Sequence, residues 1–127
     1  MSLKEQGPRV CVLKTDGINC DEETMHAFHI AGGRPKLVHV NELRWREEDL
    51  KNYQILALPG GFSYGDDVVS GKILAIELTS YLADQINDFT CGQKGLVLGV
   101  CNGFQVLVRT GLLPFGTMGE MYATLTE

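Results

Sequence analysis

Features that mark several other protein classes are missing from this chain of 127 residues. No apolar run approaches the roughly 20 residues that a membrane-spanning helix needs, and we expect no secretory leader at its start. Basic residues are not in excess: the formal net charge is −5, which argues against nucleic acid or an anionic membrane as a general partner. We therefore predict a cytoplasmic protein that binds neither nucleic acid nor membrane.

The four cysteines lack the close spacing of a disulfide framework or a zinc site. Cys11, Cys20, Cys91 and Cys101 include no C-x-x-C pair. Reduced thiols in the cytoplasm are the default interpretation. The adjacent carboxylates of Asp66-Asp67 have no third hard ligand evident nearby, so a solvated turn or helix start is favoured over a cation site. We predict no bound metal.

The chain has the size and composition of one ordinary globular domain, with 44% hydrophobic and 21% charged residues. Four short apolar segments alternate with helical patterns, which indicates βαβ units around a parallel sheet. We predict a three-layer α/β fold in a single domain over residues 1–127. The expected strands are Val10–Leu13, Leu37–Val40, Ile55–Leu58 and Leu96–Val100.

Several boundaries follow from turn and capping chemistry. Asp21 is expected to cap a helix that ends at Gly32-Gly33, and Ile73–Ile86 is expected to form another helix. The segments Gly60–Gly71 and Asn87–Gln93 are expected to be loops. The last strand has the β-branched apolar character of a strand that is buried on both faces.

One stretch carries the strongest chemical signal. Gly99-Val100-Cys101-Asn102-Gly103 fits the nucleophile elbow, in which a reactive side chain sits at a sharp turn between a strand and a helix. The glycines let the chain reverse around that residue, and the helix N-terminus favours a thiolate. A free cysteine is more often a small buried hydrophobe. The flanking glycines, the strand before and the helix after favour Cys101 as a nucleophile.

A thiolate that attacks an amide also needs donors for the oxyanion that forms. The backbone N–H of Asn102, which follows the nucleophile, supplies one donor. Because ligands of parallel sheets bind beyond the carboxyl ends of the strands, the loops Thr15–Asp21 and Gly60–Gly71 should meet the elbow at one rim. Gly60-Gly61 could be only a turn, but in combination with the elbow these glycines are expected to offer backbone N–H groups to a ligand.

Three motifs together resemble a known family. Pro59–Asp66 reads P-G-G-F-S-Y-G-D, Gly99–Gln105 reads G-V-C-N-G-F-Q, and Asp16–Asp21 reads D-G-I-N-C-D. The set is similar to the class I, triad-type glutamine amidotransferases, and more narrowly to the glutaminase subunit or domain of phosphoribosylformylglycinamidine synthase, an enzyme of purine biosynthesis. The resemblance covers nearly the whole chain, and it implies a flavodoxin-like sheet.

The resemblance also implies roles for individual residues. Cys101 would attack the side-chain amide of glutamine, and the N–H groups of Gly61 and Asn102 would hold the oxyanion. Gln105 and the backbone of Gly60, Gly61 and Phe62 would bind the glutamine. The released ammonia would pass to a synthetase subunit, and ATP and magnesium would bind to that partner. No cofactor is expected on this domain.

The sequence departs from the family pattern in one respect. The family's catalytic His and the acid that orients it lie well after the elbow, but this chain has no histidine beyond His39. His26 and His29 share a predicted helix, where side chains that are solvated or satisfied by hydrogen bonds are expected. The chain therefore resembles the N-terminal part of the domain, C-terminally incomplete, and we expect it to be inactive alone. Two alternatives stay open, an elbow-cysteine hydrolase or stress protein similar to DJ-1, and a catalytically inactive docking subunit.

Overall fold

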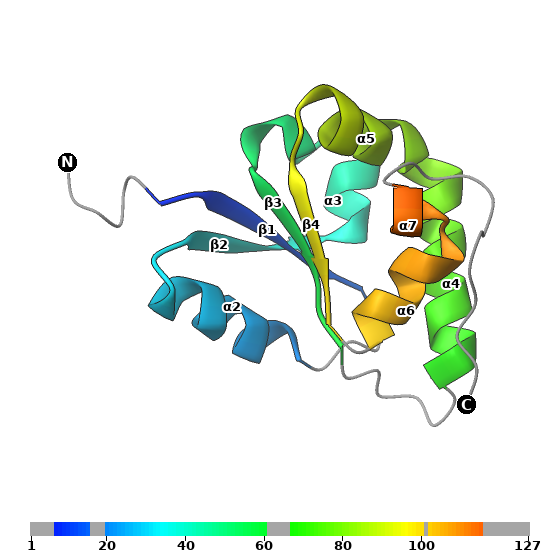
Figure 1. Ribbon diagram of the computed structural model, residues 1–127, viewed down its shortest axis with the longest axis horizontal. Helices are drawn as coiled ribbons and strands as arrows, with labels where there is room; N and C mark the ends of the chain where they lie inside the picture. The colour runs from blue at the N-terminus through cyan, green and yellow to red at the C-terminus, as the bar shows by residue number, and fades with distance from the viewer. Residues whose placement is uncertain (1–6, 16–19, 61–66, 101, 116–127) are drawn as a thin grey trace.

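A four-stranded parallel sheet forms the centre of the computed structural model, which describes residues 7–15, 20–60, 67–100 and 102–115 (Figure 1). The strand order is β2-β1-β3-β4, and each neighbouring pair is parallel. This confirms the predicted α/β class, and the order is the one with which flavodoxin-like sheets begin. The strands are β1 (Arg9–Lys14), β2 (Arg34–His39), β3 (Ile55–Leu58) and β4 (Leu96–Gly99).

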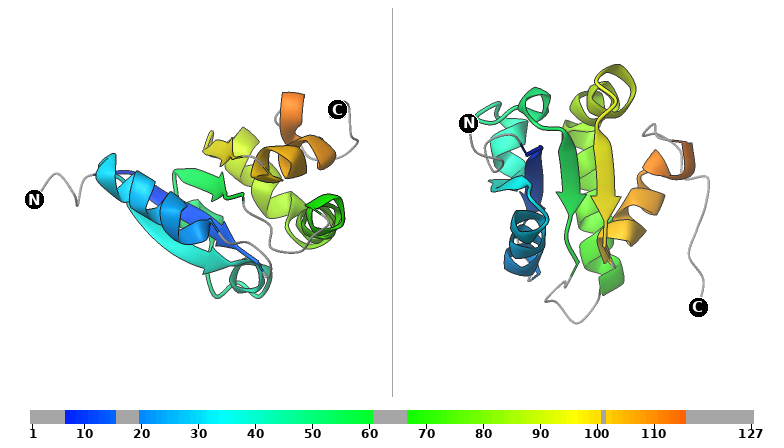
Figure 2. Two further views of the ribbon diagram at one scale, coloured as in Figure 1. Left: turned by 90° about the horizontal axis from the view of Figure 1, so that it is seen from below. Right: turned by 60° about the vertical axis from the view of Figure 1, so that its left-hand side comes forward.

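Helices lie on both faces of this sheet. In the right-hand view of Figure 2, α2 lies in front of the sheet while α4 lies behind β3 and β4. Among the helices that the structure describes, none is long and apolar enough to cross a membrane. The helical elements are α2 (Asp21–Ile30), α3 (Val40–Arg44), η1 (Leu50–Asn52), α4 (Asp67–Tyr81), α5 (Ala83–Asn87), η2 (Asp88–Gly92), α6 (Asn102–Arg109) and α7 (Leu112–Phe115).

The larger hydrophobic core fills the face that α4 and α6 cover. Leu56 and Leu58 of β3 project into it, and Leu74 and Leu78 of α4 and Val106 of α6 close it from the helix layer. A smaller cluster on the other face joins β1 and β3 to α2. Successive side chains of β1 and β3 therefore point alternately into the two cores, as expected for inner strands of a parallel sheet.

The prediction that the last strand is buried on both faces is wrong for this chain. Leu96, Leu98 and Val100 are 67%, 47% and 45% exposed. They alternate with Val97, which packs on the larger core, so one face of β4 is covered and the other is bare. The reason is that α2 reaches only β1, β2 and part of β3, and no described helix lies in front of β4 (Figure 2).

Other boundaries also need correction. β2 begins at Arg34 and includes Pro35, which an edge strand tolerates because its N–H is not needed for a second ladder. Asp67–Gly71 is helical, so the predicted loop ends earlier, and a π-helical turn, η2, replaces most of the second predicted loop. Asp21 is the first residue of α2 and not its cap; Cys20 precedes it and makes no side-chain capping bond.

Candidate functional site

The described ends of the loops that follow β1, β3 and β4 lie at one rim, which is where the three loops are predicted to meet. The backbone N–H of Cys20, after β1, donates to the carbonyl of Gly60, after β3, at 3.4 Å. The N–H of Val100, after β4, donates to the carbonyl of Leu58 at 3.1 Å. Thus the described ends of all three loops are joined through the end of β3.

The connection after β4 is as short as an elbow requires. β4 ends at Gly99 and α6 begins at Asn102, so only two residues separate strand from helix. The N–H of Gly103 donates to the carbonyl of Val100 at 2.9 Å, which closes the turn. Cys101 is one of those two residues; it lies outside the described residues, and its role stays a prediction.

Both glycines of the elbow are required by close packing. A Cβ on Gly103 would lie 2.0 Å from the carbonyl oxygen of Leu58, and a Cβ on Gly99 would lie 2.7 Å from Leu107 Cδ1. Real Cβ atoms essentially never approach that closely, and the Leu58 obstacle is backbone. The start of α6 is therefore pressed directly onto the end of β3, where the glycine-rich loop begins.

The remaining predicted site residues are placed only in part. Gly60 is buried at the rim, and Gln105 is exposed on α6. Asn102 is the first residue of that helix, where backbone N–H groups have no intrahelical partner. Gly61 and Phe62 lie outside the described residues. The structure thus brings Gly60 and the start of α6 to the same strand end, and the individual roles stay predictions.

The histidines occupy positions with other functions. His39 is the N-cap of α3: its Nδ1 accepts the N–H of Asn41 at 3.1 Å, and its own N–H donates to Glu42 at 3.0 Å. His26 and His29 are exposed on α2, as predicted, and line a surface pocket with Arg34 and Pro35 at the start of β2. The start of β2 is the end of the sheet opposite the elbow.

The thiol of Cys11 is unsuited to nucleophilic chemistry. Its side chain is fully buried in β1. Burial raises the pKa of the Cys11 thiol to about 12, and the nearby carboxylates of Glu48 and Glu42 add to the effect. Because the thiolate is the reactive form, this cysteine is a core residue. Cys20 is half-buried at the rim, and Cys91 is exposed on η2.

One polar pocket was not predicted. A cavity of about 290 Å³ lies between the ends of β1 and β2 and the helices α3 and α4. Its walls include Arg44, whose guanidinium stacks on the ring of Tyr81 at 3.8 Å. These two residues are far apart in sequence, and no local motif joins them. Among the described residues, no group of three metal-ligating side chains is found.

Comparisons with known proteins agree with this geometry. Residues 7–127 match the family described as the CobB/CobQ-like glutamine amidotransferase domain. The chain is 46% identical over 119 residues to the phosphoribosylformylglycinamidine synthase subunit PurQ of Dehalococcoides mccartyi, covering 94% of this chain and 46% of that protein. It is 43% identical over 120 residues to the PurQ of Methanococcus maripaludis, covering 93% and 44%.

A solved structure shows the same fold. The Thermotoga maritima structure titled PurLQS is matched with a TM-score of 0.66 and 35% identity, over 84% of this chain and 46% of that one. The chain therefore spans about half the length of the curated relatives it matches. The chain belongs to the CobB/CobQ-like glutamine amidotransferase family.

Proposed function

We propose that this chain carries the nucleophile half of a glutaminase site, in the glutaminase component of phosphoribosylformylglycinamidine synthase. The observation that carries the proposal is the packing of Gly103 against Leu58, which fixes the start of α6 at the end of β3. That packing brings the start of α6 to the end of β3, where Gly60 lies, and so supports a reactive site at this end of the sheet. The PurQ relatives support the choice of reaction.

In this reaction Cys101 acts as the nucleophile. Its thiolate attacks the side-chain carbonyl carbon of glutamine, ammonia leaves, and water then hydrolyses the thioester to glutamate. The N–H groups of Asn102 and Gly61 stabilise the oxyanion; loss of one such donor typically lowers the rate by about 10²–10³. The N-terminus of α6 favours the thiolate because its dipole and its N–H groups point toward negative charge.

Glutamine itself is held by residues on both sides of the elbow. Gln105 is exposed one turn into α6, so a ligand at the helix start can reach its amide. The backbone of Gly60–Phe62 supplies further hydrogen bonds from the β3 side. Neither group needs a cofactor, and any ATP and magnesium would belong to a synthetase partner. Because the solved relative is titled as a PurLQS assembly, we propose that a synthetase subunit receives the ammonia.

We propose that the general base comes from polypeptide outside these 127 residues. His39 already accepts a capping hydrogen bond, and the sequence has no histidine after it. The relatives are about twice as long as the matched region. We propose that the second half of such a protein supplies the base and its orienting acid, and that it packs on the bare face of β4.

Trapping with diazo-oxo-norleucine, an electrophilic glutamine analogue, tests this proposal. Peptide mass mapping should find the label on Cys101, with glutamine protecting it, while iodoacetamide labels the exposed Cys91 as well. Label spread equally over Cys20, Cys91 and Cys101 would contradict a glutamine site. Reaction of Cys101 with iodoacetamide but not with the analogue would favour the alternative elbow-cysteine hydrolase.

A further inference from the structure

The start of α2 has no part in the chemistry proposed above, although it lies at the same rim. The D-G-I-N-C-D motif ends there, with Cys20 before the helix and Asp21 as its first residue. The N–H of Cys20 donates to the carbonyl of Gly60 at 3.4 Å, which links the motif directly to the end of β3. The motif therefore contacts the loop that is predicted to hold the oxyanion.

Two further contacts anchor Cys20 and the first turn of α2. Thr24 donates twice to the carbonyl of Cys20, from its Oγ1 at 2.7 Å and from its N–H at 3.1 Å. Asp21 is only 7% exposed, and its carboxylate lies 3.7 Å from Lys14 Nζ at the end of β1. These contacts hold the backbone of Cys20 in place, so its N–H has a fixed direction.

The hydrogen bond from Cys20 also sets the direction of the N–H that follows the Gly60 carbonyl. A peptide group is planar and, before a residue other than proline, almost always trans, so its C=O and its N–H point in opposite directions. The Gly60 carbonyl points to the start of α2, which packs on the smaller core. The helix α6 packs on the larger core, on the opposite face of the sheet. The N–H of that peptide group is therefore directed away from α2 and toward the side on which α6 begins.

We propose that the start of α2 positions the oxyanion donor: the backbone N–H of Cys20, held by Thr24, orients the peptide group after Gly60 so that the N–H of Gly61 faces the elbow. This role rests on the proposed function, in which Gly61 is one of the two oxyanion donors. Cys20 and Thr24 are positioning residues, because they act through the peptide group and not on glutamine itself. A donor that is fixed in advance needs no reorganisation at the moment of reaction.

The kinetics of ammonia release test this role, in a chain extended by the segment that follows the matched region in the Dehalococcoides mccartyi relative and assembled with its synthetase partner. Cys20→Pro removes the N–H. We expect kcat to fall at least about tenfold at a nearly unchanged KM, because misplacement of a group by about 1 Å can lower a rate about 10²-fold and the oxyanion forms only during the reaction. Cys20→Ala keeps the N–H and should keep the parental kcat. A parental kcat in Cys20→Pro would overturn the proposal.

A second readout separates positioning from damage to the elbow. Alkylation of Cys101 by iodoacetamide displaces iodide and forms no oxyanion, so its rate in Cys20→Pro should stay within about twofold of the parental rate. Thr24→Val removes the Oγ1 bond and should lower kcat about two- to tenfold, the equivalent of one net hydrogen bond. Thr24→Ser keeps the hydroxyl and should restore the parental kcat. Equal losses of alkylation and of kcat would mean that the variants disturb the elbow itself, and would overturn the proposal.

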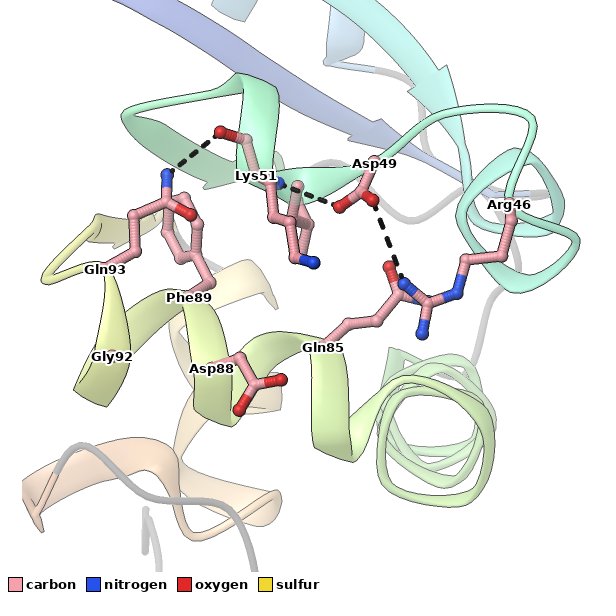
Figure 3. Close-up of a pocket in the computed structure, with 9 residues that line it drawn as sticks. Arg46, Asp49, Lys51, Gln85, Asp88, Phe89, Gly92 and Gln93 are labelled. Carbon is pink, nitrogen blue, oxygen red and sulfur yellow. Dashed lines mark hydrogen bonds and ion pairs between the residues drawn. The ribbon is translucent and has the colours of Figure 1, made fainter.

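Gln93 provides a matched control at the other end of the sheet. A pocket of about 390 Å³ lies there between η1 and the α5–η2 segment, and Gln93 and the buried Gln85 are among its lining residues (Figure 3). Gln93 Nε2 donates to the carbonyls of Tyr53 at 2.5 Å and Lys51 at 3.4 Å, so it joins the segments that precede β3 and β4. Gln93→Leu should lower the free energy of unfolding and leave kcat unchanged. A kcat as low as that of Cys20→Pro would mean that any loosening of the sheet suffices, and would overturn the proposal.

Failure of the positioning role and failure of the proposed function give different results. If the extended parent chain releases no ammonia, the glutaminase assignment is wrong and the positioning role is wrong with it. If the parent hydrolyses glutamine and Cys20→Pro is equally fast, the assignment stands and only the positioning role is wrong.

Discussion

Gly103 has no Cβ, and this allows the start of α6 to pack closely against the end of β3. In the Gly103→Ala variant the new Cβ would lie 2.0 Å from the carbonyl oxygen of Leu58. Because that oxygen belongs to the backbone, the backbone of β3 or of α6 has to move. Alanine favours helix over glycine by about 1 kcal/mol, but overpacking against backbone outweighs that gain. We expect a net loss of about 1–3 kcal/mol in the free energy of unfolding, measured by urea denaturation.

Gly92→Ala is the control for this prediction. A Cβ at Gly92 meets nothing within 4 Å, so its stability should change by no more than about 0.5 kcal/mol. If Gly103→Ala is as stable as Gly92→Ala, the close approach of α6 to β3 is wrong. The elbow geometry would then lose its main support.

The carboxylate of Glu48 couples stability to pH. A short hydrogen bond from Lys36 Nζ, with a second from the hydroxyl of Tyr53 at 3.0 Å, lowers the pKa of Glu48 below its ordinary value of 4.5. Because the folded-state pKa is the lower one, this contribution is fully present above pH 4.5 and is lost as pH falls through the lowered pKa. The unfolding free energy should therefore decrease on acidification.

Glu48→Gln tests this linkage. The variant should lose stability less steeply than the parent between about pH 5 and pH 2, when unfolding is followed by circular dichroism at each pH. Glu47→Gln changes the exposed neighbouring residue and should keep the parental pH slope. A parental slope in Glu48→Gln would show that Lys36 and Tyr53 do not hold the folded-state carboxylate in its charged form.

Among the elements, β3 and β4 differ sharply although they are neighbours in the sheet. Leu56 of β3 is 1% exposed in the larger core, whereas Leu98 of β4 is 47% exposed on the bare face. We expect Leu56→Ala to cost about 2–5 kcal/mol of unfolding free energy, because it leaves a cavity. Leu98→Ala should cost less than about 1 kcal/mol, since little buried area is lost. Similar costs for the two variants would mean that the bare face is covered in solution.

Sequence patterns predicted the elements whose signals lie in neighbouring residues of the chain. The strand β3 and the glycine-flanked turn at Gly99–Gly103 carry their signals within a few residues, and both appear where the sequence places them. The bare face of β4 could not be predicted, because an apolar run has the same composition whether or not a second layer covers it. Gln85 and the pocket around it arise from packing between distant segments, which no local pattern encodes.

At the scale of the whole molecule, the chain is half of what its relatives contain. It has the parallel sheet, the strand-to-helix turn and the glycine-loop end at one rim, and none of the described elements covers the exposed face of β4. The exposed face of β4 is explained if the second half of the longer relatives packs there, and the proposed base would then come from that same half. A nucleophile without its acid–base partner should react slowly, because general acid–base catalysis raises the rate by a factor of about 10²–10⁴.

Release of ammonia from glutamine tests the central claim most directly. The 127-residue chain is compared with a chain extended by the segment that follows the matched region in the Dehalococcoides mccartyi relative, in the presence of its synthetase partner. We predict little or no ammonia from the short chain, and turnover by the extended chain that Cys101→Ala abolishes and Cys91→Ala leaves intact. Equal turnover by the short chain would contradict the account, because the base would then lie among His26, His29 and His39.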